Sequence, residues 1–135
     1  MSRSRQLLTA LIALIVVLGI GFAWGASGRA EAQRALDETR QRVDLAEARG
    51  YILDARVSLY NVNFGDAQRQ LEEAKAPLNR ARDRYQQQGK RDAAEGINAA
   101  LTHVQEAQRL AGKLDQAANS QAGEALNAIK AATAK

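Results

Sequence analysis

The chain has 135 residues, no cysteine and one histidine, which excludes disulfides and thiolate metal sites. Its net charge of +4 is mild, and basic and acidic residues alternate as they do on solvated helix faces, which argues against nucleic acid as a partner. Alanine, arginine, glutamine, glutamate and leucine dominate, aromatic residues make up only 4%, and no stretch alternates as a strand does. We therefore expect an all-α protein.

Residues 6–28 carry no charge, and Arg5 and Arg29 flank them. As a helix, about 23 residues span roughly 34 Å, enough to cross a hydrocarbon layer of about 30 Å. Residues 1–28 are therefore predicted to form an N-terminal tail and a transmembrane anchor. The alternative is a cleaved signal peptide with Arg3 and Arg5 as its positive start. The apolar part, residues 7–23, is longer than a usual signal core, which favours an uncleaved anchor.

The flanking charges predict the orientation of this anchor. Arg3, Arg5 and the terminal amine precede it, whereas the basic residues that follow are mixed with acidic ones. A short basic tail usually stays inside the cell. We therefore expect a single-pass protein of the inner membrane, with its N-terminus in the cytoplasm and its C-terminal domain in the periplasm.

Small residues near the end of the apolar stretch suggest a packing face. Gly21 and Gly25 form a G-x-x-x-G pair, and Gly28 lies one turn further on. Such glycines let two helices approach closely in a bilayer, although glycine is also common by chance in membrane helices. Trp24 lies where an interfacial aromatic anchor is expected.

The helix is expected to continue to Asn61, the first strong breaker. Residues 29–44 are mostly polar and are predicted to be a helical stalk. Along the helix, two apolar stripes lie about 200° apart, and residues 45–62 carry both of them. One follows a 3-4 spacing and comprises Leu36, Thr39, Val43, Ala46, Gly50, Leu53, Val57, Tyr60 and Phe64. The other contains the residues that we expect to contact the bundle or a partner: Leu45, Ile52, Leu59 and Val62, with Ala48 and Ala55.

Residues 45–135 are predicted to form a small antiparallel helical bundle, which contains three long helices and a short C-terminal one. Asn63 should cap the second long helix, and Gly89 should end it. Pro77 should kink this helix or split it near Ala74. Its narrow apolar stripe comprises Phe64, Ala67, Leu71, Ala74, Leu78, Ala81 and Tyr85.

The third and last helices follow from similar signals. Asp92 and Glu95 resemble a capping box that opens the third helix. The inward stripe of this helix comprises Ala93, Ile97, Ala100, Leu101, Val104, Ala107, Ala111 and Leu114. A break at Asn119 and Ser120 then precedes the short last helix, whose inward residues are Ala122, Ala125, Leu126 and Ile129.

Residues 51–74 resemble one tetratricopeptide-type (TPR-like) helical hairpin. The match rests on Tyr51 and Ala55 in the first helix, the turn at residues 63–67, and Leu71 and Ala74 in the second. The sequence departs from the pattern at Asp54 and Ser58, where large residues are usual, and Pro77 comes two residues early. Stable arrays need at least about three repeats, so the resemblance implies TPR-like packing and protein binding without catalysis.

No set of residues indicates catalysis, a cofactor or a metal. His103 has no cysteine that could share a metal with it, and the neighbours Glu72 and Glu73 point about 100° apart on a helix. The one basic cluster comprises Arg80, Arg82, Arg84, Lys90 and Arg91. These cations either interact favourably with the helix dipole at a helix C-terminus or form a docking patch for an acidic protein or anionic lipid.

The core is thin, because alanine stripes bury little area while each ordered residue costs about 1–2 kcal/mol of backbone entropy. We therefore expect contacts with other proteins to help hold the domain. The sequence predicts a non-enzymatic accessory subunit of a larger integral membrane complex of the respiratory, photosynthetic, secretion or envelope type. Two alternatives remain: a membrane-tethered TPR-like adaptor that captures a soluble periplasmic protein, and a self-associating coiled-coil spacer that forms a homo-oligomer.

Overall fold

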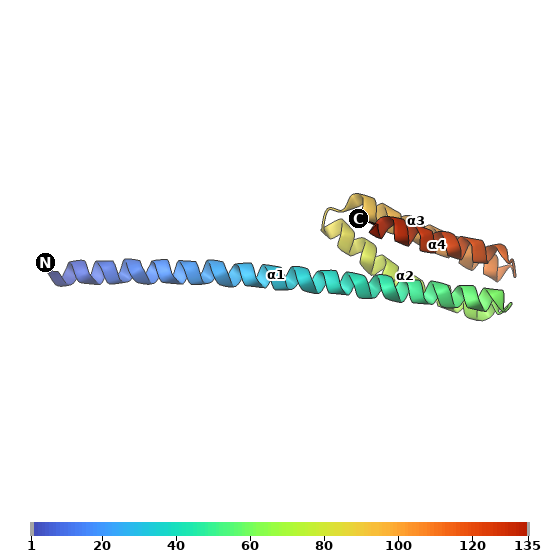
Figure 1. Cartoon of the computed structure of the whole chain (residues 1–135), viewed down its shortest axis with the longest axis horizontal. Helices are drawn as coiled ribbons and strands as arrows, with labels where there is room; N and C mark the ends of the chain where they lie inside the picture. Colours follow the sequence, from blue (N-terminus) through green and yellow to red (C-terminus); the bar gives the residue numbers. More distant parts are fainter. Residues whose placement is uncertain (1, 135) are drawn as a thin grey trace. The chain divides into compact units, whose positions relative to one another are not determined.

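The computed structural model describes residues 2–134, with side chains from residue 4 onward, and these residues contain helices and no strand. Met1 and the side chain of Arg3 lie outside the described part. The helices are α1 (Ser2–Tyr60), α2 (Phe64–Gln87), α3 (Arg91–Gly112) and α4 (Ala117–Thr133) (Figure 1). The expected all-α class, an apolar N-terminal helix followed by a helical bundle, is confirmed.

The chain divides into two compact units, Met1–Glu38 and Thr39–Lys135. The boundary falls inside the predicted stalk. In the first unit, α1 is long and apolar enough to cross a membrane, as judged from length and composition. Its large apolar side chains, among them Leu11, Ile15 and Leu18, are exposed. A surface of this kind requires lipid or other apolar helices around it.

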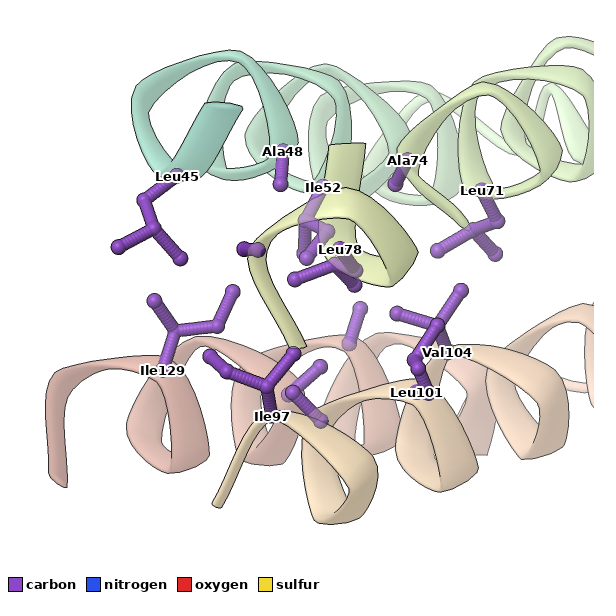
Figure 2. Close-up of a cluster of buried hydrophobic side chains, with 14 of the residues drawn as sticks. Leu45, Ala48, Ile52, Leu71, Ala74, Leu78, Ile97, Leu101, Val104 and Ile129 are labelled. Atoms are coloured by element: carbon purple, nitrogen blue, oxygen red, sulfur yellow. The ribbon is translucent and has the colours of Figure 1, made fainter. Parts of the chain in front are cut away.

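The second unit is a bundle of residues 39–60 of α1 with α2, α3 and α4. Short connections join these segments, so that consecutive helices run antiparallel (Figure 1). Figure 2 shows side chains from all four segments meeting in one core, among them Leu45, Ile52, Leu78, Ile97 and Ile129. Buried alanines line the same faces and bring the helices close together.

The predicted features of α2 are mostly confirmed. Asn63 caps the helix, because its side-chain oxygen accepts a hydrogen bond from the backbone N–H of Asp66. Every residue of the predicted stripe from Phe64 to Tyr85 is buried. The predicted split near Ala74 is wrong, because α2 continues through Pro77. The ring of Pro77 is fully buried in the core, and this packing offsets the lost backbone hydrogen bond.

Three predicted positions around α3 and α4 are wrong. The helix α3 begins at Arg91 after Lys90, and no side chain caps it, so Asp92 and Glu95 form no capping box. Leu114 lies outside α3 and is 69% exposed. The chain breaks there, so that α4 already begins at Ala117 and no break occurs at residues 119 and 120.

One backbone motif explains most of these differences. After α1, α2 and α3 the chain turns through a left-handed residue, and these residues are Val62 (φ 59°), Gly89 (φ 70°) and Leu114 (φ 59°). At the end of α3 the N–H of Asp115 donates to the carbonyl of Leu110, and the ends of α1 and α2 carry the equivalent bonds. This pattern is a Schellman motif, in which glycine normally occupies the left-handed position. Val62 and Leu114 occupy it at a steric cost.

We predict that Val62→Gly stabilises the bundle by about 0.5–1 kcal/mol, because it removes left-handed strain at an exposed side chain. Gly89→Ala is the matched control and should destabilise the bundle, since an added methyl group meets no atom within 4 Å there and only the backbone is strained. Urea unfolding of the full chain in mild detergent, followed by circular dichroism, measures both. Destabilisation by both substitutions would contradict the strain at Val62.

Candidate functional site

The predicted packing residues of the anchor are not covered by other residues of the first unit. A side chain added at Gly21, Gly25 or Gly28 would meet no atom within 4 Å among the described residues. Trp24 is also exposed. No other residue of the first unit therefore fills this glycine face.

The predicted contact residues of α1 divide into two groups. Leu45, Ile52 and Leu59 are buried and belong to the core of the bundle. Val62 does not continue their face, because it lies in the turn after α1 and is exposed. The inward face of α1 is thus used by the bundle itself and offers nothing to a partner.

The opposite face of α1 remains uncovered by the described part of the chain. We call it the outward stripe. Its large residues are exposed: Val43 by 58%, Leu53 by 51%, Val57 by 60% and Tyr60 by 80%. Ala46 and Gly50 lie between them and are exposed as well. The 3-4 spacing in the sequence was the signal for this line of residues.

The basic cluster is split by ion pairs with α1. The guanidinium groups of Arg80 and Arg84 each lie 2.9 Å from a carboxylate oxygen of the buried Asp44. Arg84 also donates to the side-chain oxygen of Gln41, whose amide donates to the carbonyl of Ala81 at 3.0 Å. We call these groups, Gln41, Asp44, Arg80 and Arg84, the α1–α2 clamp. It fixes the start of the bundle, and it holds two of the five predicted docking cations.

The remaining cations differ in how free they are. Arg82 pairs with its neighbour Asp83 at 2.9 Å. Lys90 and Arg91 are exposed and make no ion pair within the described part of the chain. Lys90 and Arg91 are therefore the members of the cluster that remain able to bind an anion directly.

A groove of about 270 Å³ lies beside the clamp. It is lined by Thr39, Arg40, Val43, Asp44, Arg80 and Arg84.

The residues considered for catalysis have ordinary structural contacts. The Nδ1 atom of His103 lies 2.8 Å from the side-chain oxygen of Gln121. Glu72 accepts hydrogen bonds from Lys75 and Gln108, and the Lys75 ammonium in particular lowers the pKa of that carboxyl. Among the described residues, no group of three or more acidic or histidine side chains is placed to hold a metal ion.

Comparison with known proteins gives one match. The family model described as Tar ligand binding domain homologue matches residues 5–91. This range takes in nearly all of α1, the whole of α2 and the first residue of α3, and it leaves out α4. No curated protein and no solved structure matches the chain. The TPR-like reading of residues 51–74 is not confirmed, although these residues do form a helical hairpin between α1 and α2.

We predict that Asp44→Asn destabilises the bundle by about 2–3 kcal/mol, because it leaves Arg84 largely buried without its carboxylate. Glu47→Gln is the matched control and should change the stability by less than about 0.5 kcal/mol, since the Glu47–Arg80 pair is exposed. The free energy of unfolding in urea measures both. Equal effects would show that burial of the clamp adds nothing.

Proposed function

Because the chain belongs to the family of Tar ligand binding domain homologues, we propose that residues 39–135 are a non-catalytic recognition domain in the periplasm. Residues 6–28 hold this domain at the inner membrane. The family model supports a helical ligand-binding domain of the kind found in chemoreceptor-like proteins. We further propose that the chain acts as an accessory subunit, whose domain braces a larger integral membrane complex.

The outward stripe of α1 is the observation that carries this proposal. Burying a large apolar side chain is worth about 1.5–3 kcal/mol, so an uncovered line of four is costly to leave in water. Contiguous apolar surface of this kind marks a protein-contact face. Within the described residues the bundle covers only the inward face of α1. A second protein that packs along residues 43–60 would bury the apolar side chains that the bundle leaves exposed.

The second candidate is self-association along the same stripe. Read as heptads, the stripe places Val43, Gly50 and Val57 at a positions and Ala46, Leu53 and Tyr60 at d positions. Valine at a with leucine at d favours a parallel two-stranded coiled coil. In such a pair, Arg42 faces Glu47 and Arg49 faces Asp54 of the other copy. Two copies anchored by the same N-terminal segment are parallel by construction, which fits this charge pattern.

The third candidate, a tethered TPR-like adaptor for a soluble periplasmic protein, makes a different demand. It requires residues 29–135 alone to fold and to retain a soluble protein on affinity purification. Loss of every partner once the anchor is removed favours the membrane complex over the adaptor.

We predict that Leu53→Gln combined with Val57→Gln releases the chain from its assembly, because the middle of the stripe loses its apolar contacts. The matched control is Val62→Gln with Leu114→Gln, which changes two somewhat more exposed apolar residues outside the stripe. Light scattering after extraction in mild detergent gives the mass. The wild type and the control should exceed the 14.6 kDa monomer, whereas the stripe variant should approach it.

Mass spectrometry of the extracted species identifies the occupant of the stripe. Foreign subunits support the accessory role, and a doubled chain mass supports self-association. A monomeric wild type, or a stripe variant that stays assembled, would contradict the proposed contact face.

We predict that Gly21→Leu with Gly25→Leu weakens the same assembly, because leucine side chains hold two membrane helices apart. Gly19→Leu is the control, since residue 19 lies about 200° around the helix from residue 21. Both variants keep the length and apolar character of the segment. Blue native electrophoresis compares the assembled fractions, and equal fractions in both variants would remove the proposed packing face.

We predict that Ser120→Cys reacts with a membrane-impermeant maleimide in intact cells, because the domain is proposed to lie in the periplasm. Ser120 is exposed on α4, and the chain has no other cysteine to label. A gel-shift reagent reports the labelled fraction before and after lysis. Labelling that appears only after lysis would place the domain in the cytoplasm instead.

A further inference from the structure

A depression of about 450 Å³ lies where α2 ends and α3 begins, beside the end of α4. It is lined by Tyr85, Gly89, Lys90, Arg91, Asp92, Ala93, Ala132 and Thr133. We propose that this depression binds a phosphate group, carried either by an anionic lipid or by a soluble phosphate compound. The proposal is independent of the occupant of the outward stripe.

The first turn of α3 supplies backbone donors. Lys90 occupies the cap position of this helix, and no side chain accepts a hydrogen bond from its first amides. By contrast, Asn63 caps α2, and an Asp115 carboxylate oxygen accepts from the Ala117 N–H at the start of α4. Unsatisfied amides at a helix N-terminus, together with the helix dipole, attract anions.

Two cations adjoin these amides. Lys90 and Arg91 line the depression and make no ion pair within the described residues, whereas Arg80, Arg82 and Arg84 are held by acidic side chains. An arginine next to a lysine supplies both a planar fork and a point charge, and both suit phosphate oxygens.

Tyr85 gives an independent indication of a ligand. Its side chain is only 8% exposed and lines the depression, and no hydrogen bond of its hydroxyl occurs within the described part of the chain. No fully buried polar side-chain atom among the described residues lacks a partner. The hydroxyl is therefore not fully buried, and because Tyr85 lines the depression the hydroxyl can donate to an oxygen of a group bound there.

Asp92 opposes anion binding, since its carboxylate lies in the first turn of α3 and lines the same depression. The balance favours a ligand with several acceptor oxygens, which can engage the ammonium, the guanidinium, the amides and the phenol together. A phosphate group has these oxygens. The volume is also larger than a bare phosphate needs, so it leaves room for the group to which the phosphate is attached.

The test uses the full chain, labelled with ¹⁵N and reconstituted in lipid nanodiscs at physiological ionic strength. In neutral phosphatidylcholine discs, inorganic phosphate and glycerol phosphate are titrated while the amide signals of residues 85–94 are followed. A second sample replaces part of the lipid with phosphatidylglycerol. Shifts that need the soluble compounds identify a soluble ligand, and shifts that need phosphatidylglycerol identify the lipid headgroup.

Three variants decide whether the proposed groups are responsible. Lys90→Gln with Arg91→Gln should weaken binding at least about tenfold, because two charge-assisted contacts are lost. Arg109→Gln with Lys113→Gln removes the same charge from the other end of α3 and should leave the affinity unchanged. Asp92→Asn should tighten binding about two- to fivefold, since it removes the opposing carboxylate.

The proposal fails if neither phosphate nor phosphatidylglycerol shifts the amides of residues 85–94. It also fails if the two double variants weaken binding equally, because the effect would then be one of net charge. A Tyr85→Phe variant that folds normally should bind more weakly than wild type, and an unchanged affinity would remove the hydroxyl from the site.

Discussion

The second unit depends on one constraint, which is that residues 43–60 of α1 are apolar on two opposite faces. The bundle covers the face of Leu45, Ile52 and Leu59, and its alanine-lined helices have no further layer for the other face. Turning α1 about its axis would only exchange the buried face for the exposed one. The outward stripe is therefore a consequence of a small bundle built around a helix that is apolar on both sides.

The clamp explains how such a small bundle holds α1 in register. Asp44 is buried, and two arginines of α2 neutralise it. If α1 slid or rotated, these ion pairs would break and the buried carboxylate would be left without a partner. The same pairs decide which cations of the basic cluster remain available. Arg80 and Arg84 serve the fold, whereas Lys90 and Arg91 lie beyond the end of α2 and face the depression at the start of α3. One basic stretch of sequence thus divides into a structural part and a part that we propose binds an anion.

Much of the fold could be predicted from the sequence because its signals are local. The Asn63 cap, the stripe from Phe64 to Tyr85 and the stop at Gly89 each depend on neighbouring residues. Val62 and Leu114 look like further members of apolar stripes in the sequence, because a left-handed turn is normally marked by glycine and not by valine or leucine. The clamp could not be predicted from the sequence either, since Asp44 and Arg84 lie far apart along the chain and no local pattern pairs them. Both stripes of α1 could be read from their spacing, but the sequence did not tell which of them the bundle would cover.

The stripe and the clamp both lie within the residues that match the Tar ligand binding domain homologue family. The central claim is that another protein surface covers the stripe in the membrane. Hydroxyl-radical footprinting of the full chain in native membranes tests this claim most directly, with detergent-dispersed monomer as the reference. The account predicts that Leu53, Val57 and Tyr60 are oxidised much more slowly in the membrane than in the monomer, while Val62 and Leu114 react equally in both. Equal oxidation of the stripe residues in membrane and monomer would contradict it.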